Sequence, residues 1–122
     1  MDYANIPNDF EIEYRFLTSE EGGRRTGPPF QGYRPDWIYA DIHEPNQAWM
    51  IWPCFLDEKG VLFAEGTQVP AAGLARMVIV DKGLRESVHR DRIRPGVRGY
   101  LVEGPIKVAE ATVTKVVDLQ DK

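Results

Sequence analysis

Cationic side chains that follow a glycine pair are the residues of this chain best suited to binding chemistry. The glycines precede Arg24, Arg25 and Thr26. Guanidinium groups, hydroxyls and the backbone N–H groups of a glycine turn are donors that contact phosphate oxygens. The same run is also typical of a tight structural loop, in which glycine supplies a positive φ and the arginines lie across a strand or pair with Glu20 and Glu21. Both interpretations stay open, with the structural loop slightly favoured.

A second group of cations lies between Arg76 and Arg98, where seven basic residues accompany three acidic ones. The rest of the chain holds 8 basic and 16 acidic residues, and the formal net charge is −4. Arg90, Arg92 and Arg94 follow His89 within this segment and could form a basic recognition edge. A solvated helix or turn would give the same pattern. The net charge itself gives no indication of nucleic acid or an anionic membrane as partner.

A third group is aromatic. Trp49 and Ile51 share one face of an expected strand, and Met50 and Trp52 share the other. Packing in the core or at the end of the barrel is the favoured interpretation of these aromatic residues. Only one pair can point into the core, so the other must be covered by a loop, by the inserted segment or by a partner, which keeps an apolar interaction patch as the alternative. Arg34 precedes this segment in the sequence, and its planar guanidinium suits carboxylates or carbonyls near the edge of the sheet.

Residues for catalysis are hard to find. The chain contains neither a phosphate-binding loop motif nor a nucleophile-elbow motif. His43 and His89 lack companions at metal-ligand spacing, and the single cysteine, Cys54, lies among apolar residues and is expected to be a buried small hydrophobe. We therefore expect no catalytic residue, metal, nucleotide or other cofactor.

The cellular compartment is predicted from what the sequence does not contain. The first ten residues show no secretory signal pattern, and no run of about 18 apolar residues occurs. One cysteine forms no internal disulfide, which fits a reducing environment. The expectation is a cytoplasmic protein with no membrane partner.

The elements that position these groups are predominantly strands. Phe10 to Leu17 alternates apolar and charged residues with period two. A shift in the inward phase near Ala109 and Glu110 predicts a β-bulge. Turn residues at short intervals indicate an all-β sandwich or closed barrel, and closure is favoured because it leaves no exposed edges. The further strands are expected at Arg34–Ile42, Gln47–Trp52 (with Pro53 ending the central part), Val61–Ala64, Leu74–Val80, Gly99–Glu103 and Ile106–Val117, and a single short helix at Leu84–Arg94.

One long stretch is more specific. Phe10 to Pro35 reads FEIEYRFLTSEEGGRRTGPPFQGYRP, and Arg98 to Val117 reads RGYLVEGPIKVAEATVTKVV. In order and almost all spacing, the first stretch resembles the opening of the third, C-terminal domain of bacterial elongation factor Tu, and the second is similar to that domain's last two strands. The residues that carry the resemblance at the N-terminal end are Leu17, Glu21, Gly22, Gly23, Arg24, Thr26, Phe30, Gly32, Tyr33, Arg34 and Pro35.

The resemblance implies a six-stranded antiparallel closed β-barrel over residues 10–117. Residues 1–9 would be an N-terminal extension and residues 118–122 a C-terminal tail. It differs from the family at Arg25, where the family has histidine, at Ile106, where the family has a cation, and at Lys82–Pro95, which looks like an insertion.

In the factor, this domain helps to grip the T-stem of aminoacyl-tRNA, packs on the GTPase domain and meets the exchange factor. Because the GTPase domain has no counterpart in this chain, the resemblance implies a non-enzymatic binding module for a protein partner, or for tRNA or another translation-related RNA. Two alternatives remain. One is a neutralising, immunity-type or competitor protein that mimics the factor, and the other is a small enzyme with an unrecognised site.

Overall fold

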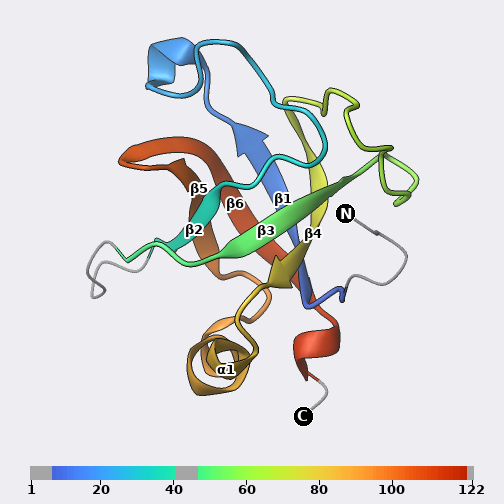
Figure 1. The fold of residues 1–122 in the computed structure, drawn as a ribbon, viewed down its shortest axis with the longest axis vertical. Helices are drawn as coiled ribbons and strands as arrows, with labels where there is room; N and C mark the ends of the chain where they lie inside the picture. The colour runs from blue at the N-terminus through green and yellow to red at the C-terminus, as the bar shows by residue number, and fades with distance from the viewer. Residues whose placement is uncertain (1–6, 41–46, 121–122) are drawn as a thin grey trace.

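The chain forms a curled antiparallel sheet in the computed structural model, which describes residues 7–40 and 47–120. The sheet has six strands in the order β2-β5-β6-β1-β4-β3 (Figure 1). This confirms the expected six antiparallel strands with a short helical insertion. The strands are β1 (Phe10–Phe16), β2 (Asp36–Tyr39), β3 (Ile51–Leu56), β4 (Ala72–Ile79), β5 (Arg98–Glu103) and β6 (Ile106–Val116).

The sheet is a half-barrel rather than the closed barrel that the sequence led us to expect. The edge strands β2 and β3 approach each other at an isolated bridge, in which Trp37 and Trp49 exchange two backbone hydrogen bonds of 2.8 Å. Farther along β3, the backbone N–H of Phe55 donates to the side chain of Gln31 (2.8 Å) instead of to β2. A side chain therefore occupies the place that a continuous ladder would need.

Pro53 does not end the strand, contrary to expectation, and β3 continues to Leu56. The reason is its position: β3 is an edge strand that pairs only with β4, where Pro53 lies opposite Met77. The carbonyl of Met77 accepts a hydrogen bond from the N–H of Asp9, the residue before β1 (3.0 Å). Pro53 is thus not required to donate a hydrogen bond to β4, and proline is tolerated at such edge positions.

The helical insertion begins and ends two residues before the expected helix, at Lys82 and Arg92 instead of Leu84 and Arg94. Helix α1 (Lys82–Leu84), a π-helical turn (Arg85–His89) and α2 (Arg90–Arg92) follow one another, and Asp81 caps the first turn. The strand expected at Val61–Ala64 is reduced to one bridge between Leu56 and Leu62. The expected strand through Ile42 is described only as far as residue 40, where β2 has already ended.

The predicted bulge is present in β6, one residue before the expected position. Leu101 lies opposite Ala109 whereas Val102 lies opposite Lys107, so Val108 is the extra residue. Val108 and Ala109 are consequently both fully buried. The bulge bends the long strand and curls the sheet.

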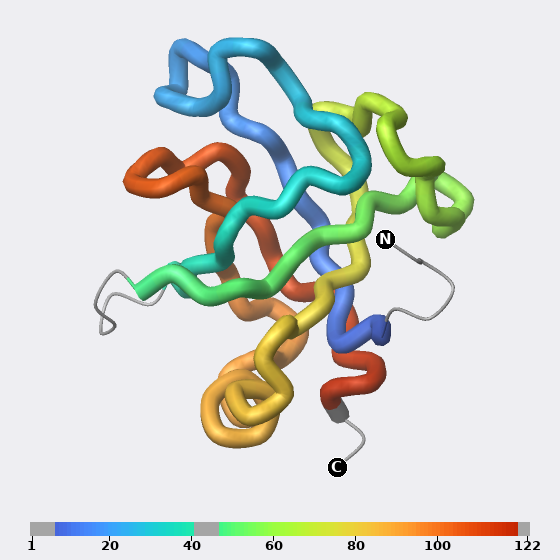
Figure 2. The backbone as a smooth tube through the Cα atoms, viewed as in Figure 1, coloured from blue at the N-terminus to red at the C-terminus, as the bar shows by residue number. Residues whose placement is uncertain are grey.

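The core fills the concave side of the sheet, and the two ends of the half-barrel are covered differently. Phe10, Ile12, Tyr14 and Phe16 of β1 all point into it. The helical insertion covers one end, and the loop of residues 17–35 lies at the opposite end (Figure 2). Leu119, in the short 3-10 helix Asp118–Gln120, is also fully buried, so the core includes residues beyond 117.

Candidate functional site

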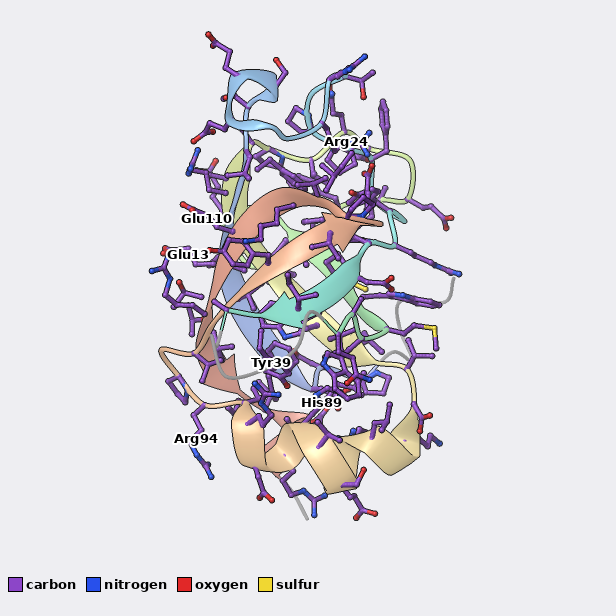
Figure 3. The ribbon with its side chains drawn as sticks, turned by 90° about the vertical axis from the view of Figure 1, so that its left-hand side faces the viewer. Glu13, Arg24, Tyr39, His89, Arg94 and Glu110 are labelled. Atoms are coloured by element: carbon purple, nitrogen blue, oxygen red, sulfur yellow. The ribbon has the colours of Figure 1, made fainter. Side chains whose placement is uncertain are left out.

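The nine residues expected to bind a partner lie in three separate parts of the molecule. Arg24 lies at one end of the half-barrel and Arg94 at the opposite end, beside the helical insertion (Figure 3). Arg25 and Thr26 follow Arg24, whereas Arg90 and Arg92 belong to the insertion. Arg34, Trp49 and Trp52 belong to β3 and its neighbours. The structure therefore does not bring the three groups into one site.

The glycine pair serves the geometry of the loop. Thr18 and Glu21 form a capping box on the 3-10 helix Ser19–Glu21, and Gly22 ends that helix with φ +93°. A side chain at Gly23 would place its Cβ 2.4 Å from the carbonyl oxygen of Leu17. Both glycines are thus required by backbone conformation and close packing.

Arg24 is used inside the molecule. Its Nη1 is 2.5 Å from Glu103 Oε2, its Nε donates to the carbonyl of Gly27 (3.0 Å), and its Nη2 donates to the hydroxyl of Thr26 (3.3 Å). The guanidinium also lies over the ring of Tyr33, whose hydroxyl donates to the same Glu103 carboxylate. These contacts join the loop to the β5–β6 turn and leave Arg24 and Thr26 committed to the fold.

Of the two arrangements expected for the arginines in a structural loop, pairing with Glu20 and Glu21 is not found for the described residues, since Arg24 reaches Glu103 of β5. Glu21 instead forms a two-bonded pair with Arg15 (2.9 and 3.0 Å), and Arg15 also contacts Glu110 (3.0 Å). The hydrogen bonds from Arg15 hold the pKa of Glu21 down at about 2. Arg25 is exposed, and its side chain forms no hydrogen bond or ion pair with another described residue.

An apolar surface, which we call the β3–β4 face, is formed by Met50, Trp52, Val78 and Val80. Trp52 lies opposite Val78 in the register, and the N–H of Val80 donates to the carbonyl of Met50 (3.1 Å). Met50 is 54% exposed and Val80 38%. The guanidinium of Arg34 lies 4.5 Å from the centre of the Trp52 ring. The structure therefore brings two of the expected binding residues, Arg34 and Trp52, into contact.

Next to this face, the buried Cys54 and the half-buried Arg76 lie opposite each other in β3 and β4. Cys54 is 2% exposed, and burial raises the pKa of its thiol to about 11. A thiol with so high a pKa is a poor nucleophile, which supports the expected structural role. The Nε of Arg76 is buried and has no hydrogen-bond partner among the described residues.

Trp49 points away from the β3–β4 face and packs against the core, which confirms that the two tryptophans occupy different sides. Its ring meets the imidazole of His89 edge to face at 4.9 Å. His89 is 1% exposed, and its Nδ1 lies 2.6 Å from the hydroxyl of Tyr39. Burial, and secondly the charge of Arg92, lowers the pKa of His89 to about 4. His89 is therefore an interior residue, and its expected place on a recognition edge is wrong.

The three arginines expected to form a basic recognition edge, Arg90, Arg92 and Arg94, have different surroundings. Arg92 lies over the ring of Tyr39 at 3.7 Å, and Arg90 is close to Glu86 at 3.6 Å. Arg94 is exposed beyond the end of the helix (Figure 3). Arg90 and Arg94 share a cavity of about 550 Å³ with Lys115 of β6, a residue that the sequence gave no reason to include.

Chemistry beyond binding has little support in the described residues. Across residues 7–40 and 47–120, no group of three or more His, Cys, Asp and Glu side chains is placed to hold a metal ion. A hollow of about 950 Å³ on the outer side of β1 and β4 contains Glu13 and Glu110 (Figure 3), but Glu110 is paired with Arg15. The helices among these residues are all too short or too polar to cross a membrane. His43 lies outside the described residues.

Val78 and Val80 are the residues of the β3–β4 face that sequence reasoning missed. Their signal is the alternation of Leu74 to Val80, which places Val78 and Val80 on the side opposite the buried Met77 and Ile79. Recognising them also requires the register between β3 and β4, which the sequence does not reveal. No protein-family model matches the chain, and a search of curated proteins finds no significant match.

Proposed function

We propose that this protein is a non-enzymatic binding module that resembles the third domain of elongation factor Tu and binds a protein partner through the β3–β4 face. The observation that carries the proposal is the apolar patch in which exposed Met50 and Val80 lie beside half-buried Trp52 and Val78, with Arg34 over the Trp52 ring. Contiguous apolar surface on one side of a small domain marks interaction sites. Tryptophan and arginine are also the residues that dominate binding energy at protein interfaces.

The arginines beside the patch define the chemistry of the partner. Arg34 lies on the Trp52 ring, and Arg76 lies opposite the buried Cys54 next to it. The partner therefore presents apolar side chains that cover Trp52 and Met50, together with a carboxylate that reaches the guanidinium groups. An arginine pair of this kind suits carboxylates because each guanidinium can donate two parallel hydrogen bonds.

The resemblance supports a binding role in a second way. The matching stretches, Phe10–Pro35 and Arg98–Val117, belong to a domain that contacts other proteins and tRNA in the factor. Within the matching loop, Arg24 and Thr26 are held by intramolecular contacts, so an RNA-facing role of that loop has less support than a protein-facing role of the β3–β4 face.

The proposal is tested by capture of a partner on immobilised protein, with Trp52→Ala and Met50→Ala as test variants. Phe30→Ala is the matched control, because Phe30 is 56% exposed in a different part of the chain. We expect a partner that stays bound at high salt with wild type and Phe30→Ala and is lost with both test variants. Truncation of a central tryptophan costs about 2 kcal/mol or more, which is roughly a 30-fold loss of affinity.

Two results would contradict this function. A partner that binds Trp52→Ala as well as wild type would exclude the β3–β4 face. Capture of tRNA alone, with release as salt is raised, would favour an RNA-backbone role instead, because phosphate contacts weaken steeply with salt. Thermal unfolding of each variant shows whether the fold is retained.

A further inference from the structure

A second candidate site lies at the far end of the molecule from Arg24, between the end of the helical insertion and β6. This cavity has a volume of about 550 Å³. Arg90 and Arg94 line it from the insertion and Lys115 from β6, with Asp91 as the acidic residue of the lining. Small-molecule sites commonly occupy about 300–1,000 Å³, so the cavity has room for a small organic ligand.

Two of the three cations of this cavity have no anionic partner in the described part of the chain. The side chains of Arg94 and Lys115 form no hydrogen bond or ion pair with another described residue. Arg90 has Glu86 as its ion-pair partner at 3.6 Å, which is longer than a hydrogen bond. Its side chain is 30% exposed and lines the cavity. Three cations around one cavity favour an anionic ligand, since each can form a charge-assisted hydrogen bond.

Part of the cavity wall is apolar. Half-buried Val116 and exposed Pro95 form this part of the lining, whereas Ile93 and Leu119 behind them are 1% and 0% exposed. Because Pro95 follows Arg94 in the chain, part of the apolar wall and part of the cationic rim come from the same turn. A site with cations at its rim and apolar atoms behind them suits a ligand that has both kinds of surface, rather than a bare ion.

We propose that this cavity binds a small organic phosphate monoester. The phosphate oxygens accept hydrogen bonds from Arg90, Arg94 and Lys115, and the apolar body of the ligand packs against Pro95 and Val116. The site is separate from the β3–β4 face, so it is independent of the protein-binding function proposed above.

Amide chemical-shift titrations with three probes test the site in the full chain, at constant ionic strength maintained with sodium chloride. Inorganic phosphate supplies the anion alone, phenyl phosphate supplies the anion with an apolar ring, and phenol supplies the ring alone. We expect saturable shifts at residues 91–94 and 114–116 with phenyl phosphate, with tighter binding than for either of the other probes. Equal affinities for inorganic phosphate and phenyl phosphate would overturn the organic ligand and leave an ion site only. Shifts that do not saturate would overturn the site.

Charge-removing variants locate the binding groups. Arg94→Gln and Lys115→Gln should each weaken phenyl phosphate about tenfold, the value for loss of one charge-assisted hydrogen bond. Arg25→Gln and Lys59→Gln remove exposed cations in other parts of the chain and should leave the affinity unchanged. An equal loss in all four variants would show general charge attraction and refute the site. Binding of a short single-stranded RNA that Arg94→Gln weakens, with no binding of phenyl phosphate, would refute a small-molecule ligand.

Discussion

Acidification should destabilise the fold through His89, and replacement of this residue by glutamine should remove the effect. The folded state holds the imidazole in its neutral form, buried between Tyr39 and Trp49. The charged groups that face it from the helical insertion are Arg92, which lowers the pKa further, and Asp81, which raises it. Burial is the largest cause, so the pKa falls from 6.5 to about 4.

The sign and size of the effect follow from this lowered pKa. Above pH 6.5 both the folded and the unfolded chain carry a neutral His89, and no stability depends on it. As the pH falls below 6.5, His89 binds a proton in the unfolded chain but stays neutral in the folded chain, so the free energy of unfolding decreases. The loss reaches about 2.5 kcal/mol at pH 4.5 and is complete, at roughly 3 kcal/mol, below pH 4, since one pKa unit corresponds to about 1.4 kcal/mol.

Urea unfolding at pH 7.0, 6.0, 5.0 and 4.5, followed by tryptophan fluorescence, measures this dependence in wild type and His89→Gln. The wild type should lose about 2.5 kcal/mol more than the variant between pH 7.0 and 4.5, whatever the stability of the variant at neutral pH. Tyr39→Phe is the matched control: it removes the 2.6 Å contact to Nδ1 but keeps the imidazole buried, so it should retain the wild-type pH dependence. Parallel curves for wild type and His89→Gln would refute the reasoning, because they would show that His89 is not held neutral by burial.

Four further substitutions test the contacts that hold the half-barrel together, each by urea unfolding at pH 7. Asp9→Ala should lower the free energy of unfolding by about 3 kcal/mol. The buried carboxylate accepts hydrogen bonds from the N–H of Ile79 and from two nitrogens of Arg85, and its removal leaves the Arg85 charge without its partner. A cost below about 1 kcal/mol would contradict this. Gln31→Leu should cost about 2 kcal/mol, because it leaves a buried N–H of the edge strand without an acceptor, and no change would show that β3 can reach β2 without it. Arg24→Ala should cost about 1 kcal/mol and Arg25→Ala less than about 0.5 kcal/mol, and the reverse order would show that the loop is held by the exposed arginine.

Local pattern predicted much of the sheet. The alternation of Phe10 to Leu17 gives β1 and its inward side chains directly, because a strand with one dry face has period two. The same rule separated Trp49 from Trp52, which the structure confirms. It also indicated the β6 bulge within one residue. These features depend on residues close together in the sequence.

The incorrect predictions concern contacts between distant segments. Arg24 pairs with Glu103, 79 positions away, and no local rule favours that partner over the adjacent carboxylates. His89 is a polar residue in a basic segment, which suggested an exposed position. The insertion instead folds over one end of the half-barrel and places His89 in the interior. The sheet stays open because the side chain of Gln31 occupies the position of a ladder bond beside Phe55, and the local sequence does not show this contact.

The open side of the half-barrel explains why a partner would bind through side chains rather than through strand addition. An exposed edge strand normally offers N–H and C=O groups to another chain. Along β3, Pro53 has no N–H, Gln31 satisfies the N–H of Phe55, and Trp37 forms the bridge to Trp49. The backbone groups of this edge are therefore largely occupied or absent, while Trp52 on the outer surface remains accessible. Under the function proposed above, a partner would therefore recognise the β3–β4 face by shape and charge, and substitution of the side chains of this face would change affinity without altering the strand edge itself.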